Sequence, residues 1–141
     1  MGRRRYAQVE HTADICVHVF GKDMGELFSN AAYAMFDMTY ELGRVRESET
    51  RRIEVSAPDP EMAMVRLLSE LIYLSESGSM VFKGFDVKCT RSKKGLKVVC
   101  KATGERFDAS RHERRALIKA VSYYSLEIDE ERGMANIVFD T

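Results

Sequence analysis

The fold is predicted from Val9-Glu10-His11-Thr12-Ala13-Asp14-Ile15, which leads directly into Cys16-Val17-His18-Val19-Phe20. The second part is typical of a strand covered on both sides, because both of its alternating faces are fairly apolar. The polar residues His11, Thr12 and Asp14 stand immediately before this strand. A polar group beside a core strand needs a partner, so Asp14 requires backbone N–H groups, a basic side chain or a metal ion.

The C-terminal end carries a second carboxylate of this kind. Ile137-Val138-Phe139 is an apolar strand that ends in Asp140, and the terminal carboxylate of Thr141 follows. If the two strands lie side by side, three oxygen-bearing groups can converge on a hard cation such as Ca²⁺. The residues alone leave two alternatives for Asp14, which is either a carboxylate that accepts backbone N–H bonds or a metal ligand. Thr141 is likewise either a metal ligand or part of a frayed chain end.

Length and composition indicate one soluble domain over residues 1–141. The 22 Lys and Arg are balanced by 22 Asp and Glu, whereas a protein that binds nucleic acid by charge alone is usually basic. No apolar run is long enough for a membrane span, and no signal peptide is recognisable, so we expect a cytoplasmic protein with no membrane partner. The three cysteines contain no C-x-x-C pair, which disfavours a zinc site.

The order of predicted elements favours an α+β domain, a largely antiparallel β-sheet packed with two long helices. One helix is expected from the cap at Asp23 to about Tyr40, and the other from Pro58-Asp59-Pro60 to about Ser77. The predicted strands are 15–20, 52–57, a hairpin of 81–90 with 96–103, a long strand over 116–128, and 134–139. The hairpin tip, 91–95, is basic, and both solvent exposure and contact with phosphates would account for its charge.

Several motifs, in this order, resemble the archease family along nearly the full length. They are His11-Thr12-Ala13-Asp14, Ser69-Glu70-Leu71-Ile72-Tyr73-Leu74, Gly104-Glu105-Arg106-Phe107-Asp108 with His112, Lys119-Ala120-Val121-Ser122-Tyr123, and Phe139-Asp140. The chain departs from the family pattern at Tyr124, where histidine is usual.

The resemblance implies an accessory protein of the RtcB-type RNA ligase, which joins RNA ends in tRNA splicing and RNA repair. An archease promotes guanylylation of the ligase and so supports multiple turnover. The resemblance also implies a divalent metal site, often filled by calcium, at Asp14, Asp140 and Thr141. The expected partner is the ligase itself, and contact with RNA is expected to be indirect or weak.

Four other residues are candidates for function. His11 is either a group that holds Asp14 or a strand-end histidine, and it is a poor calcium ligand. Lys119 is an outward lysine in the simplest interpretation, and in the archease interpretation it takes part in ligase activation. For Asp108 and His112 we predict a local side-chain hydrogen bond that fixes their loop.

Two other functions compete with ligase activation. Paired carboxylates with a metal could activate water for hydrolysis, although no P-loop or nucleophile motif is present. Alternatively, the protein is chaperone-like or structural, and its metal only ties the chain ends together. On the archease resemblance, we expect an activator that is not itself an enzyme.

Overall fold

The structure is a computed structural model that describes residues 4–9 and 14–141. His11, Thr12 and Ala13 of the opening motif therefore lie outside the described residues. The elements, in chain order, are β1 (Tyr6–Val9), β2 (Ile15–Phe20), α1 (Met24–Thr39), the 3-10 turn η1 (Leu42–Arg44), β3 (Glu49–Ala57), α2 (Pro60–Glu76), β4 (Met80–Ser92), β5 (Gly95–Arg106), β6 (Ala120–Val121), β7 (Glu127–Asp129) and β8 (Met134–Asp140).

Both helices begin where their capping residues predict. The Asp23 side chain accepts a hydrogen bond of 2.8 Å from the backbone N–H of Glu26, and Asp59 accepts one of 2.8 Å from Met62. Each bond satisfies an N–H group that has no partner within the helix. Within the described part of the chain, neither helix is apolar enough over a sufficient length to cross a membrane.

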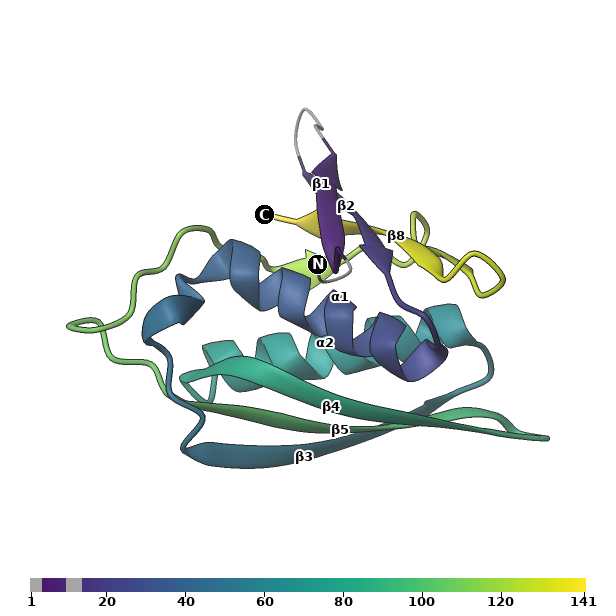
Figure 1. The fold of residues 1–141 in the computed structure, drawn as a ribbon, viewed down its shortest axis with the longest axis horizontal. Helices are drawn as coiled ribbons and strands as arrows, with labels where there is room; N and C mark the ends of the chain where they lie inside the picture. The colour runs from purple at the N-terminus through teal and green to yellow at the C-terminus, as the bar shows by residue number, and fades with distance from the viewer. Residues whose placement is uncertain (1–3, 10–13) are drawn as a thin grey trace.

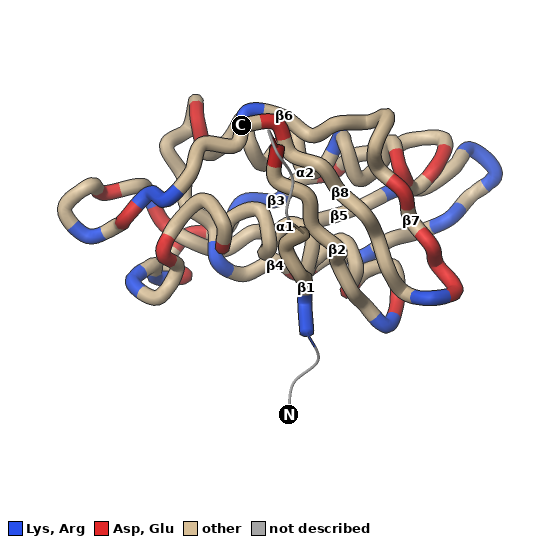
Figure 2. Tube along the Cα trace, turned by 90° about the horizontal axis from the view of Figure 1, so that it is seen from above, with Lys and Arg blue, Asp and Glu red and all other residues tan. Residues whose placement is uncertain are grey.

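The strands form two antiparallel sheets with both helices between them (Figure 1). One sheet has the order β1-β2-β8-β6, with β7 also paired to β8, and the other has the order β3-β5-β4. Figure 2, seen from above, shows β1, β2 and β8 lying over the helical layer. This arrangement confirms the predicted α+β fold, although the sequence did not indicate that the strands divide between two sheets.

A continuous core joins the two sheets through the helices. It contains Val17 and Phe139 from the five-stranded sheet, Phe28 from α1 and Leu68 from α2, all fully buried. The opposite face of β2 carries Cys16, His18 and Phe20, which are only half-buried. The expectation that β2 is covered on both sides is therefore wrong, because the helices pack against one face of its sheet only.

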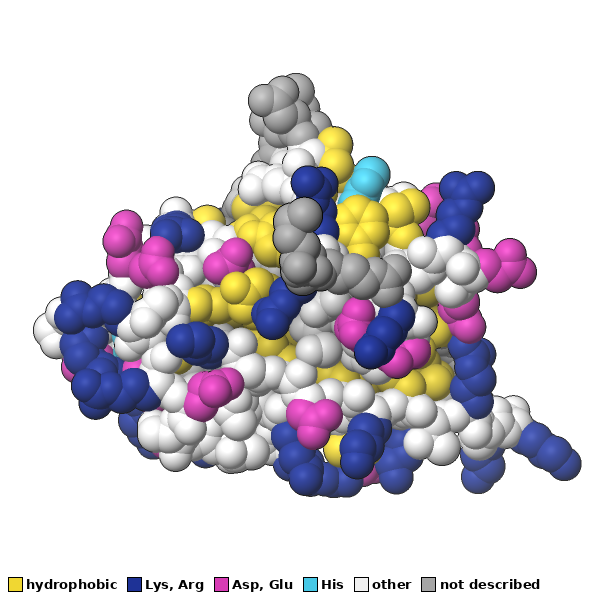
Figure 3. Space-filling model, viewed as in Figure 1, with side chains coloured by type: hydrophobic (Ala, Val, Ile, Leu, Met, Phe, Trp, Pro, Cys, Tyr) yellow, Lys and Arg dark blue, Asp and Glu magenta, His cyan; other side chains and the backbone are white. Residues whose placement is uncertain are grey.

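The three-stranded sheet also has one face without helices. Exposed residues alternate with buried ones along β3 and β5, as the two-residue period of a strand requires. Lys and Arg side chains gather along the lower rim of the molecule, below this sheet (Figure 3). The sheet is thus apolar on the helix side and charged on the other.

The predicted long strand over 116–128 is wrong. In the structure only Ala120–Val121 and Glu127–Asp129 are strands, and a turn separates them. The apolar residues of this segment suggested burial, but Tyr124 is 97% exposed and Leu117 is 43% exposed. Ile118, Val121 and Leu126 of this segment are buried in the core, but the segment pairs with β8 only over its two short strands and turns between them.

Candidate functional site

Strands β2 and β8 bring Asp14 and Asp140 to the same end of the five-stranded sheet. The two strands are antiparallel, and their last pair at this end is Ile15 with Phe139. Asp14 and Asp140 are the next residues past that pair. Directly opposite residues of antiparallel strands have Cβ atoms about 4.5–5.5 Å apart, so the two carboxylates belong to one site if the register continues by one residue.

Strand β6 adds Lys119 to this end of the sheet. Ala120 pairs with Asp140, and the backbone N–H of Lys119 donates a bond of 2.8 Å to the carbonyl oxygen of Asp140. Figure 2 shows acidic and basic segments beside each other where β6 meets the C-terminus. Lys119 is exposed, as predicted. We call Asp14, Lys119, Asp140 and Thr141 the acidic edge.

The donors at the acidic edge fit a hard cation if a third oxygen donor joins the two carboxylates. Asp14 and Asp140 supply carboxylate oxygens, which Ca²⁺ prefers. Among residues 4–9 and 14–141, no three His, Cys, Asp or Glu side chains gather as a metal site. Thr141 is the third ligand that the archease resemblance implies, and it follows Asp140 directly. Calcium binding by Asp14, Asp140 and Thr141 stays a prediction.

A second polar cluster surrounds His112, which is buried below the end of β5. The backbone N–H of Asp108 donates a bond of 2.9 Å to His112 Nδ1, so the ring proton sits on Nε2. Nε2 lies 2.9 Å from Glu105 Oε2 and donates to it. The predicted local bond between positions 108 and 112 exists, but it uses the backbone of Asp108. The Asp108 carboxylate instead accepts bonds from the N–H and the hydroxyl of Ser110.

Glu105 is the centre of this second cluster. Its Oε2 accepts a bond of 2.8 Å from the backbone N–H of Arg46, and its Oε1 is paired with Arg111. These donors, the Arg46 N–H foremost, lower the pKa of Glu105 from the usual 4.5 to about 2. The cluster fastens the loop after β5, which leads to Lys119, onto the three-stranded sheet.

Glu105 makes the stability of the protein sensitive to acid. Because the native pKa of Glu105 is lowered, its ionised form stabilises the fold above about pH 4.5, and this stabilisation is lost as the pH falls towards 2. We expect Glu105→Gln to be less stable than the wild type at neutral pH and to lose less stability across this window. Urea denaturation between pH 2 and pH 4.5 measures the difference.

Glu131→Gln is the matched control for this experiment. Glu131 is exposed in the turn before β8, and no ion pair or hydrogen bond of its side chain occurs within the described residues. Its variant should follow the wild type at every pH. Parallel acid profiles for Glu105→Gln and the wild type would show that Glu105 does not contribute to acid sensitivity.

Comparison with known proteins decides the family. The profile of the archease protein family matches residues 6–141. The chain belongs to the archease family. The protein archease of Pyrococcus abyssi is 34% identical over 140 residues, covering 97% of this chain and 99% of that protein. The protein archease of Methanosarcina mazei is 36% identical over 140 residues, covering 97% of this chain and 96% of that protein.

Two solved structures share the archease fold. The solution structure of Methanobacterium thermoautotrophicum protein 1598 has a TM-score of 0.81 and 27% identity, covering 97% of this chain and 99% of that chain. A crystal structure from Thermotoga maritima, described as an archease and possible chaperone, has a TM-score of 0.56 and 22% identity. It covers 100% of this chain and 98% of that chain, and at this identity it supports the fold alone.

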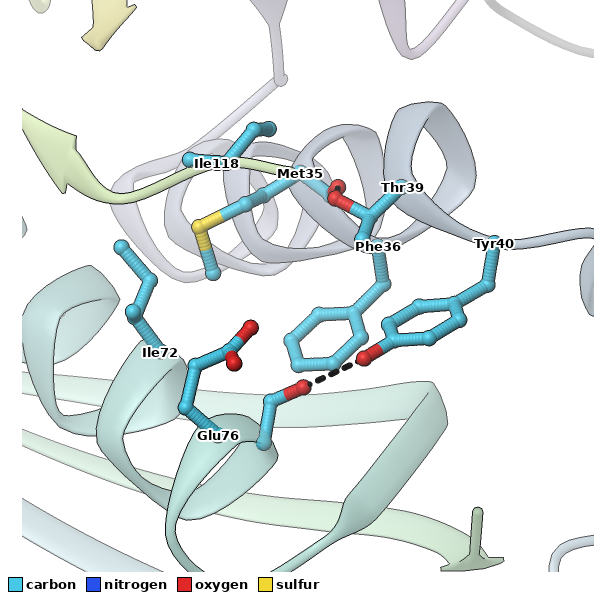
Figure 4. A pocket seen from close by; sticks show the side chains of 8 residues that line it. Met35, Phe36, Thr39, Tyr40, Ile72, Glu76 and Ile118 are labelled. Atoms are coloured by element: carbon cyan, nitrogen blue, oxygen red, sulfur yellow. Dashed lines mark hydrogen bonds between the residues drawn. The ribbon is translucent and has the colours of Figure 1, made fainter. Parts of the chain in front are cut away.

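A cavity between α1 and α2 is too small to be an active site of this archease. Its volume is about 20 Å³, which is room for about one water molecule. The Tyr40 hydroxyl and Ser75 Oγ, 2.8 Å apart, lie on its wall (Figure 4). The lining residues are Met35, Phe36, Thr39, Tyr40, Ile72, Ser75, Glu76 and Ile118. The acidic edge, where Lys119, Asp140 and Thr141 are exposed, stays the candidate site.

Sequence reasoning missed Glu105, Arg111 and Arg46 as partners of His112. Glu105 lies in a motif that resembles other archeases, and that was the available signal. Arg46, in contrast, is 59 residues away from Glu105 in the chain, and it contributes through its backbone. A contact of that kind leaves no mark on the type of residue at the position.

Proposed function

We propose that this protein activates an RtcB-type RNA ligase by promoting guanylylation of the ligase. Membership of the archease family supports the proposal. One structural observation carries it: β2, β6 and β8 bring Asp14, Lys119 and Asp140 to the same end of the five-stranded sheet, although 105 residues separate Asp14 from Lys119. Charged groups at one end of a sheet suit a protein that presents this end to the active site of a partner.

Exposed apolar side chains lie in the chain on both sides of β6, which carries Lys119 to the acidic edge. Leu117 lies two residues before Lys119, and Tyr123 and Tyr124 follow β6 after Ser122. The rings of Tyr123 and Tyr124 contact each other edge to face, with centroids 5.8 Å apart. Large apolar and aromatic groups beside a charged centre are typical of protein interfaces, so this rim favours docking to a protein partner.

A hard cation at the acidic edge is part of the proposal. Asp14, Asp140 and the terminal carboxylate of Thr141 would hold it. When bound, the cation would supply positive charge that offsets the repulsion among these carboxylates. The exposed ammonium group of Lys119 would then be available to an anionic group of the ligase or its nucleotide.

Two further functions remain as alternatives, and one assay separates them. A chaperone-like or structural role predicts no nucleotide-dependent stimulation of a ligase, and a metal-dependent hydrolase would act on substrate without any partner. The test is to incubate the purified protein with an RtcB-type ligase and labelled GTP and to measure ligase guanylylation. A guanylylation rate that the protein does not raise would contradict the proposal.

Lys119→Ala should separate function from folding. Lys119 is exposed, so its removal is expected to change the free energy of unfolding by no more than about 0.5 kcal/mol. Guanylylation of the ligase should nevertheless fall markedly. Lys22→Ala is the control, because Lys22 follows the opposite end of β2 and is also exposed. Undiminished activation by Lys119→Ala would remove Lys119 from the functional site.

A further inference from the structure

The helix-free face of the three-stranded sheet carries a cluster of cations. Lys97 and Lys101 point outward from the central strand β5, and Lys88 points outward from β4. Lys88 is paired with Val99, which places it diagonally between Lys97 and Lys101. Diagonal neighbours of this kind are about 7–8 Å apart. The three lysines thus form a zigzag on one flat surface.

The positive charge of this face extends to the hairpin tip and across to β3. We call this surface the basic face. Its cations are Arg52, Lys88, Arg91, Lys93, Lys94, Lys97 and Lys101. The carboxylates that lie on it or contact its residues are Glu47, Glu54, Asp86 and Glu130. Seven cations against four carboxylates leave a formal charge of +3. Because the whole chain has 22 Lys and Arg and 22 Asp and Glu, the rest of the protein carries a formal charge of −3. Figure 3 shows Lys and Arg side chains gathered in dark blue along the lower rim of the molecule, on the side of this sheet.

Two structural explanations, protection of an edge strand and ion pairing within the sheet, account for only some of these cations. Lysine on an edge strand prevents pairing with other chains, but Lys97 and Lys101 lie on the central strand, which is paired on both sides. Pairing within the sheet explains Arg52 and Lys97, which hold Glu54 between them. Lys88 makes no ion pair among the described residues, and it lies directly opposite Val99. Lys101 makes none there either, but it lies between Asp86 on β4 and Arg52 on β3, so its charge is offset only in part.

The chemistry of the face points to a polyanion with regularly spaced charges. Its outward positions are lysine, arginine, threonine, serine and carboxylate side chains, with Val99 as the apolar exception and no aromatic ring. A surface without aromatic groups cannot stack on bases, but lysines at this spacing can reach successive phosphates of one strand. Such contacts fix a nucleic acid without reading its sequence.

We propose that the basic face binds structured RNA through its phosphate backbone. Recognition of phosphate rests on the charges of this face, whereas the choice of RNA rests on the proposed function. The RNA would lie against the sheet, on the other side of the helices from the acidic edge. The protein can then contact RNA and the ligase at the same time through different surfaces.

The experiment measures binding of a fluorescently labelled RNA hairpin to the protein alone, over a series of KCl concentrations. The triple variant Lys88→Gln/Lys97→Gln/Lys101→Gln should bind roughly tenfold or more weakly at low salt, and its slope of log affinity against log salt should be shallower by roughly 2–3. The control Lys22→Gln/Arg44→Gln/Arg132→Gln removes the same charge from exposed positions outside the basic face, and it should bind nearly as the wild type does. Thermal melts verify that both variants fold.

Two results would overturn the proposal. One is RNA binding by the sheet variant that equals the wild type, and the other is an equal loss in both triple variants, which would indicate net charge alone. Guanylylation of the ligase without RNA should be unchanged in the sheet variant, so failure here is distinguishable from failure of the proposed function.

Discussion

Asp14→Asn is expected to remove most of the Ca²⁺-induced rise in melting temperature and to impair activation of the ligase. A cation that binds the native state alone stabilises it by mass action, because the unfolded chain cannot assemble ligands from β2 and from the C-terminus. Asparagine keeps the size and one oxygen of the side chain but removes its charge. Without metal, the variant should melt at or slightly above the temperature of the wild type, since a repulsion between carboxylates has been removed.

Ca²⁺ titrations in thermal melts, followed by guanylylation assays, test this prediction. Asp140→Asn should behave as Asp14→Asn does, because the two residues flank the same strand pair. Asp86→Asn is the control, since Asp86 is exposed on the other sheet. If the Ca²⁺ response disappears while activation survives, the metal serves the fold alone. Activation by Asp14→Asn at the level of the wild type would exclude a functional role for this carboxylate.

His112→Ala is expected to destabilise the protein by about 2–4 kcal/mol, a fall in melting temperature of roughly 5–15 °C. The substitution removes the acceptor of the Asp108 N–H and a donor to Glu105, and it leaves a void beside the ring of Phe107. An unpaired buried polar group and a void each lower stability. The loop that leads to Lys119 should loosen first, because the cluster joins it to β5.

His18→Ala is the matched control for this substitution. His18 is half-buried on the open face of β2, and no hydrogen bond of its ring occurs within the described residues. Its loss should therefore change the free energy of unfolding much less. Chemical denaturation of both variants gives the comparison, and hydrogen exchange over residues 107–119 reports the loop. Equal stability of the two variants would show that the buried imidazole does not hold this loop.

Local sequence determined the elements whose signals are local. Asp23 and Asp59 predicted both helix starts correctly, because a capping side chain acts on an N–H group three residues away. The apolar runs over 15–20 and 134–139 predicted β2 and β8, although the sequence suggested cover on both faces of β2 and only one face is buried. The pairing of these two strands, which places Asp14 and Asp140 at one end of a sheet, was also inferred from their apolar pattern and polar ends.

Tertiary structure decided everything that depends on which surfaces meet. The segment 116–128 has the composition of a strand, yet Tyr124 lies in solvent because no second layer covers it. Glu105 meets Arg46 across 59 residues through a backbone N–H, which any residue type provides. The zero net charge of the sequence conceals a basic face, because register and strand order place Lys88 between Lys97 and Lys101. Periodicity specifies which side of an element is buried, whereas the choice among possible neighbours follows from the packing of the whole chain.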